Sequence, residues 1–193
     1  MAKTGDSRDV FAVVRARLDG IGTLLEDMDA DAAERLMQML LKAKRIFVAG
    51  KGRSGYIAQC FAMRLMQMGF DVHVPGEATC SRIKRGDLLV AVSCSGTTMS
   101  TVQMARTARQ VKAQVVAVTA LPDSVLAESA DHVVVVPVTG KIVKKRYRYV
   151  LGPYNNTLFE QALLLYFDAM VYSILERKGI PKTRLRDRHA NLE

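Results

Sequence analysis

The sequence predicts an α/β protein built on a doubly wound parallel sheet. Apolar runs without alternation, such as Leu88–Val92 and Val133–Val136, are typical of parallel strands that helices cover on both faces. These runs alternate along the chain with segments of helical periodicity, as right-handed crossovers require. A short Gly/Ser loop directly follows two of the expected strands, at Gly50–Gly55 and Ser93–Thr98. Ligands of such sheets bind beyond the carboxyl ends of the strands, where both loops fall.

Two helices are expected before the first strand, from Asp6 to about Asp27 and from Asp31 to Ala43. Gly20 and Gly22 weaken the first of them locally. Its apolar residues fall on one side: Val10, Val13, Val14, Leu18, Ile21 and Leu25. We expect residues 6–43 to act in packing or assembly.

The remaining elements are expected to alternate in order. Strands are predicted at Ile46–Ala49, Asp71–Val74, Leu88–Ser93, Val115–Thr119 and His132–Val136. Helices are predicted at Ser54–Met68, Thr98–Val111, Ser124–Ala130 and Thr157–Arg177. Gly69 ends the first of these helices and Gly179-Ile180-Pro181 ends the last. Because no linker divides the 193 residues, one domain spanning 1–193 is expected, with 179–193 as a tail.

Composition narrows the function. The net charge of +9 favours anionic partners, and it is concentrated in Lys141–Arg148 and Lys182–Arg188. The sequence has no helix-turn-helix, RNP or zinc-finger pattern, so a phosphorylated small molecule is favoured over nucleic acid. Three cysteines without C-x-x-C spacing argue against a disulfide or zinc framework, and no metal or cofactor is expected. We expect no apolar run to near the ~20 residues of a membrane helix, and we expect a cytoplasmic protein without membrane partners.

The first loop contains G-x-G-x-x-G at Gly50, Gly52 and Gly55, which also suggests a dinucleotide site. Such a site needs an acidic residue at the end of the second strand, and Asp71 falls at its start instead. In the second loop, Gly96 permits a tight turn and three hydroxyls gather: Ser93, Ser95 and Thr98. One hydroxyl would suffice to cap the following helix. Three hydroxyls facing a second Gly/Ser loop favour binding of a phosphate and its sugar.

Two titratable residues stand out. Glu160 closes a Thr157-x-x-Glu160 pattern, which is either a capping box or the start of a helix that carries a general base. His189 lies near the end of the sequence, where it is either frayed or docked on a neighbouring subunit. Cys60 is expected to pack in the core with Phe61.

Seven segments together resemble the sugar isomerase (SIS) domain family: Gly50–Ala58, Phe61–Leu65, Gly69–Val72, Gly86–Leu89, Ser93–Thr98, Leu158–Gln161 and Arg188–Glu193. The last segment is similar to the branch that isomerises hexulose 6-phosphates. The resemblance implies a three-layer α/β sandwich with a five-stranded flavodoxin-like sheet and a homotetramer without metal or cofactor. It implies interconversion of D-arabino-3-hexulose 6-phosphate and fructose 6-phosphate through an enediol, as in formaldehyde assimilation by the ribulose monophosphate pathway.

The resemblance also implies roles. Glu160 would carry the proton between adjacent carbons, and His189 from a neighbouring subunit would be a second acid-base group. The substrate would be held by Gly52, Arg53, Ser54, Ser93, Ser95, Gly96 and Thr98. The sequence departs from the family in the segment 151–157 and in the basic Lys141–Arg148. Arabinose 5-phosphate isomerase and a non-catalytic sugar-phosphate sensor are the alternatives.

Overall fold

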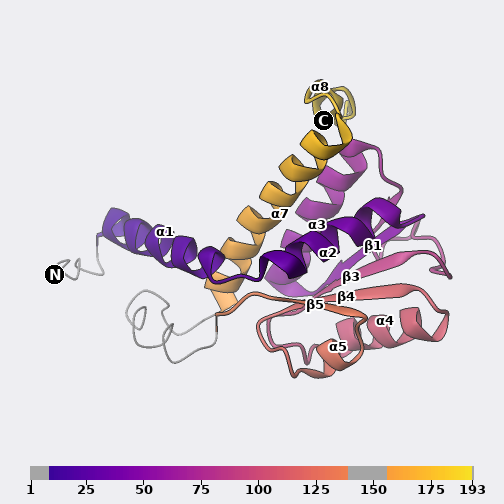
Figure 1. Cartoon of the computed structure of the whole chain (residues 1–193), viewed down its shortest axis with the longest axis horizontal. Coiled ribbons are helices and arrows are strands. Elements are labelled where there is room, and N and C mark those ends of the chain that lie inside the picture. Colours follow the sequence, from indigo (N-terminus) through magenta and orange to yellow (C-terminus); the bar gives the residue numbers. More distant parts are fainter. Residues whose placement is uncertain (1–8, 139–155, 193) are drawn as a thin grey trace.

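Five parallel strands form one sheet in the order β2-β1-β3-β4-β5 (Figure 1). The structure is a computed structural model that describes residues 9–138 and 156–192. Its strands are β1 Ile46–Gly50, β2 Val72–His73, β3 Leu88–Val92, β4 Gln114–Thr119 and β5 His132–Val135. Gly50 lies opposite Val92 in the register, so the carboxyl ends of β1 and β3 are level. In this flavodoxin-like order the direction of winding reverses between β1 and β3, which is where ligands bind.

Helices cover both faces of the sheet, as predicted. The helices are α1 Val10–Glu26, α2 Ala30–Lys42, α3 Gly52–Met68, α4 Met99–Gln110, α5 Val125–Glu128, α7 Asn156–Lys178 and α8 Thr183–Asp187. One face of the sheet shares its core with α1, α2, α3 and α7, and the other with α4. Helix α5 lies on the same side as α4 (Figure 1). The three-layer α/β sandwich expected from the sequence is therefore confirmed.

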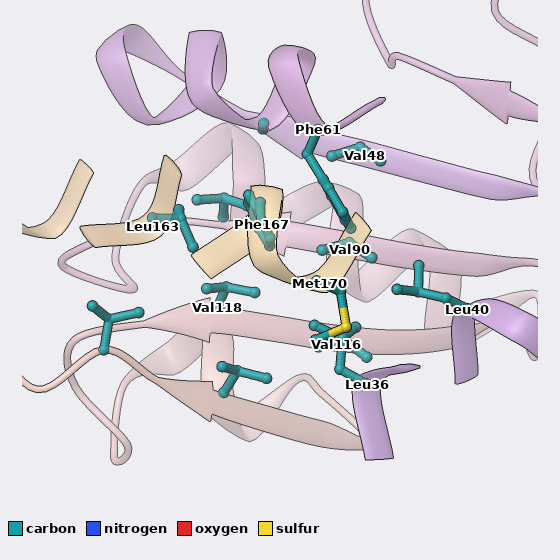
Figure 2. Packing of buried hydrophobic residues seen from close by; sticks show 14 of the residues in the cluster. Leu36, Leu40, Val48, Phe61, Val90, Val116, Val118, Leu163, Phe167 and Met170 are labelled. Atoms are coloured by element: carbon teal, nitrogen blue, oxygen red, sulfur yellow. The ribbon is translucent and has the colours of Figure 1, made fainter. Parts of the chain in front are cut away.

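Helix α7 contributes Leu163, Phe167 and Met170 to the core that lies against the sheet (Figure 2). Phe61 of α3 and Phe167 of α7 are both fully buried, and their rings stack 4.1 Å apart. Such a pair stabilises the fold beyond the burial of its area alone. By length and composition, Thr157–Lys178 could span a membrane, but its most apolar window is 56% buried inside this protein. Helix α7 is thus a core helix, and its packing holds its first turn in place.

Three expectations differ from the structure. Helix α8 was not predicted, and Cys60 is exposed on the outer side of α3, so its predicted core position is wrong. Of the predicted apolar side of α1, Ile21 is buried and Leu25 is half-buried, while Leu24, which was not assigned to that side, is buried as well. Val10, Val14 and Leu18 are exposed and Val13 is half-buried, as α1 projects from the sheet (Figure 1). The unusual stretches Lys141–Arg148 and 151–155 lie outside the described residues.

Candidate active site

A cavity of about 420 Å³ opens at the carboxyl ends of β1 and β3, at the predicted edge of the sheet. Its wall combines the first loop, the second loop and the first turn of α7. The lining residues are Lys51, Gly52, Arg53, Ser54, Val92, Ser93, Cys94, Ser95, Thr98, Thr157 and Glu160. Three segments that are distant in sequence therefore meet at one place.

The first loop turns tightly between β1 and α3. Gly52 has a φ of +58°, in the left-handed region that favours glycine. A Cβ on Gly55 would lie 2.8 Å from the carbonyl oxygen of Gly50. Because neither Gly50 nor Gly55 has a side chain, the helix can begin directly against the strand. This close approach brings Arg53 and Ser54, in the first turn of α3, to the cavity wall.

The second loop is held by its own hydroxyls. Ser93 Oγ and Thr98 Oγ1 lie 2.9 Å apart, and the N–H of Gly96 donates to Ser93 Oγ at 3.1 Å. Ser95 Oγ and Thr97 Oγ1 lie 3.0 Å apart. Gly96 itself is buried behind the loop and does not line the cavity. Gly96 was predicted to bind substrate. In the structure it lets the loop pass close to Ser124, the residue before α5.

Two helices direct their N-termini at this cavity without side-chain caps. The residue before α3 is Lys51 and the residue before α4 is Thr98, and neither side chain accepts a hydrogen bond from its helix. The first-turn N–H groups of a helix carry partial positive charge and attract anions. Because Thr98 bonds Ser93 instead, the simple capping interpretation of the second loop is wrong. The geometry suits a phosphate.

Glu160 is the buried carboxylate of the site. Its side chain is 5% exposed, whereas that of Arg53 is 63% exposed. Nε of Arg53 donates to Oε2 of Glu160, and Ser54 Oγ donates to Oε1 at 3.4 Å. Since α7 begins at Asn156, Thr157 lies inside the helix, and the carboxylate turns to α3 rather than back to form a capping box. A buried acceptor facing a cavity is the arrangement that a general base requires.

Cys94 lies beside this carboxylate. Burial, together with the negative charge of Glu160, raises the pKa of the Cys94 thiol to about 11. The thiolate is the nucleophilic form of cysteine, and a pKa this high leaves little of it near neutral pH. Cys94 therefore lines the cavity but is not expected to act as a nucleophile.

His189 does not reach the cavity of its own chain. It follows α8, and Arg184 and Arg188 lie beside Gly69, the residue that ends α3. The cavity lies at the other end of α3, a helix of 17 residues that is about 25 Å long. Figure 1 shows α8 at the far end of α7 from its first turn. His189 is exposed and bonds its neighbour Ala190, so this chain alone leaves it without contact to the site.

Most predicted site residues come together. Glu160 and six of the predicted substrate-binding residues line the cavity, while Gly96 and His189 do not. Lys51 and Thr157 also line the cavity, although Lys51 was not among the predicted site residues and Thr157 was expected only as a possible helix cap. Across residues 9–138 and 156–192, no three His, Cys, Asp or Glu side chains gather closely enough to hold a metal ion.

Comparison with known proteins assigns the class. The SIS domain model matches residues 39–153, which is more than half of the sequence, and the chain belongs to the SIS domain family.

Within that family, the chain is similar to 3-hexulose-6-phosphate isomerases. It is 38% identical to the enzyme of Mycobacterium gastri, covering 91% of this chain and 87% of the relative. It is 37% identical to that of Bacillus subtilis, covering 84% and 88%. A solved Methanococcus jannaschii structure, for which 3-hexulose-6-phosphate isomerase function was inferred, matches with a TM-score of 0.81 at 30% identity. That match covers 93% of this chain and 98% of the other.

Proposed function

We propose that this protein is a sugar-phosphate isomerase that interconverts D-arabino-3-hexulose 6-phosphate and D-fructose 6-phosphate. Relatives named 3-hexulose-6-phosphate isomerase match this chain over most of their length. The observation that carries the proposal is the cavity itself, where a buried carboxylate faces two uncapped helix N-termini and a set of hydroxyls. Such a reaction would serve formaldehyde assimilation in the ribulose monophosphate pathway.

The chemistry needs one base that serves two neighbouring carbons. Glu160 removes the proton from carbon 2, and the electron pair of that bond forms the C2–C3 double bond of the enediol. The carbonyl oxygen on carbon 3 takes a proton at the same time. Glu160 then returns its proton to carbon 3, while the hydroxyl on carbon 2 loses its proton and becomes the ketone. Binding of the remote phosphate aligns the reacting carbons.

We further propose that the active assembly is a homotetramer in which His189 of one subunit reaches the cavity of another and moves the proton between the two oxygens. The exposed apolar part of α1, which includes Leu18 at 59% exposure, supports an interface between copies. The distance of His189 from its own cavity supports delivery in trans. A cytoplasmic location belongs to the same proposal.

The test is turnover of D-arabino-3-hexulose 6-phosphate made in situ, followed through a coupled assay for fructose 6-phosphate. Wild type should turn over without added metal, and Glu160→Gln should lose turnover while it still binds the product. Deleting residues from Arg188 onward should cost activity without unfolding the core. Ligand-induced thermal stabilisation without turnover would instead indicate a sensor or another substrate, and arabinose 5-phosphate is the one to measure next.

A further inference from the structure

We propose that Arg53 is a latch on the catalytic base, closed in the free enzyme and opened by the phosphate of the substrate. The proposal rests on the proposed isomerase function and adds a step to it. Arg53 holds Glu160 until a phosphorylated sugar arrives, and it then exchanges the carboxylate for the phosphate. The sugar thereby releases the base that acts on it.

The first reason is that both oxygens of the base are occupied. Oε2 of Glu160 accepts from Arg53, and Oε1 accepts from Ser54. A carboxylate that takes a proton from carbon must present one oxygen to that carbon within hydrogen-bond distance. Each oxygen keeps a second lone pair, but the two bonds hold the carboxylate against α3, and opening one of them frees an oxygen to turn to the substrate.

The second reason is that the two partners differ in freedom. The Arg53 side chain is long and 63% exposed, so it can swing without disturbing the core. Ser54 is buried, and its short side chain has a single torsion, so its hydroxyl can move far less than the Arg53 guanidinium can. The structure therefore assigns Oε2 as the oxygen that becomes free, while Ser54 keeps Glu160 oriented through Oε1.

The third reason is that a better partner binds in the same cavity. The phosphate site predicted from the uncapped N-terminus of α4, with Ser95 and Thr98, shares its walls with Arg53. A phosphate monoester carries close to two negative charges near neutral pH, against one on a carboxylate. The guanidinium group also matches phosphate geometry with two parallel hydrogen bonds. Exchange from Glu160 to phosphate therefore lowers the electrostatic energy of Arg53.

The latch predicts a competition that binding measurements can detect. If Glu160 and the phosphate compete for Arg53, removing the carboxylate charge should tighten the binding of fructose 6-phosphate. We expect Glu160→Gln to lower its Kd about fivefold, the size expected for a partly exposed ion pair. Arg53→Gln should weaken binding about tenfold or more. In the Arg53→Gln background, Glu160→Gln should no longer tighten binding, since nothing remains to be released.

Isothermal titration calorimetry on the four variants of this double-mutant cycle supplies the numbers. Ser54→Ala is the matched control, because in that background Glu160→Gln should still tighten binding. Unphosphorylated fructose should respond to neither Glu160→Gln nor Arg53→Gln. Thermal melts confirm that each variant is folded, and Arg53→Met, which also removes the charge, replaces Arg53→Gln if the latter is not.

The outcomes separate the latch from the reaction. If Glu160→Gln tightens binding equally with and without Arg53, only general repulsion is relieved and the latch is overturned, while wild-type turnover leaves the isomerase intact. If hexulose phosphate is not turned over, the proposed function fails. The same cycle measured with inorganic phosphate by thermal shift then still decides on the latch, because the competition concerns the phosphate alone.

Discussion

Replacing Asp87 with Asn removes the negative charge from a buried ion pair at the amino ends of β1 and β3. The Asp87 side chain is fully buried and accepts from Arg45 at 2.6 and 3.1 Å and from the N–H of Lys84 at 2.8 Å. Burial alone would raise the pKa of Asp87, but the hydrogen bonds from Arg45 and Lys84 outweigh it and lower the pKa. Asn keeps the shape but takes away the carboxylate that binds the Arg45 guanidinium, which is 17% exposed. We expect a loss of about 2–3 kcal/mol in the free energy of unfolding.

Urea unfolding followed by circular dichroism measures this loss. Because the pKa of Asp87 is lower in the folded protein, its stabilisation is complete well above the unfolded value near 3.8 and disappears as the pH falls through the folded one. The deficit of Asp87→Asn should therefore be full at pH 7 and shrink below about pH 4. Glu34→Gln breaks the exposed pair with Arg177 and should cost much less stability, because solvent screens that pair. Equal losses in the two variants, or a deficit that persists undiminished in acid, would refute the reasoning.

Three more predictions follow from residues around the site and from α1. Gly96→Ala should destabilise the fold by about 2 kcal/mol and slow turnover, because φ is +62° and a Cβ would lie 2.0 Å from Ser124 Oγ; an unchanged melting temperature would contradict this. Iodoacetamide at pH 7.5 should label the exposed Cys60 before Cys94. A pKa of about 11 leaves Cys94 about 100-fold less thiolate than an ordinary thiol, and equal labelling rates of the two cysteines would refute this prediction. Leu18→Glu should reduce the mass of the assembly in light scattering, and an unchanged mass would exclude α1 from the interface.

The sheet could be predicted almost to the residue because its strands are short apolar runs between polar loops. Helix α8 could not, because its five residues, Thr183–Asp187, carry no apolar periodicity; the helix packs against the end of α3. Cys60 was misplaced because neighbouring positions of a helix are about 100° apart, so Phe61 points inward while Cys60 faces out. On a helix with one buried side, burial of one residue therefore does not predict burial of the next.

The site was predictable to the extent that topology determines it. Parallel strands place all their carboxyl ends at one edge, so the meeting of the two Gly/Ser loops followed from the alternation of elements. The pair between Arg53 and Glu160 joins residues 107 positions apart, and no local pattern encodes such a contact. The Thr157-x-x-Glu160 spacing also allowed a capping box. No capping box forms, because α7 already includes Asn156 and Thr157 and the Glu160 carboxylate binds Arg53.

The apolar character of α7 bears on how the chain is made. Its length and hydropathy are those of a segment that a membrane-insertion machinery would accept. The elements that bury it, namely α1, α2, α3 and the whole sheet, all precede it in the sequence and leave the ribosome first. We expect this order of synthesis to protect against mistargeting of the segment, because most of the surface that buries it emerges from the ribosome first. A circular permutant that moved α7 to the front would lose that protection while keeping every contact of the finished fold.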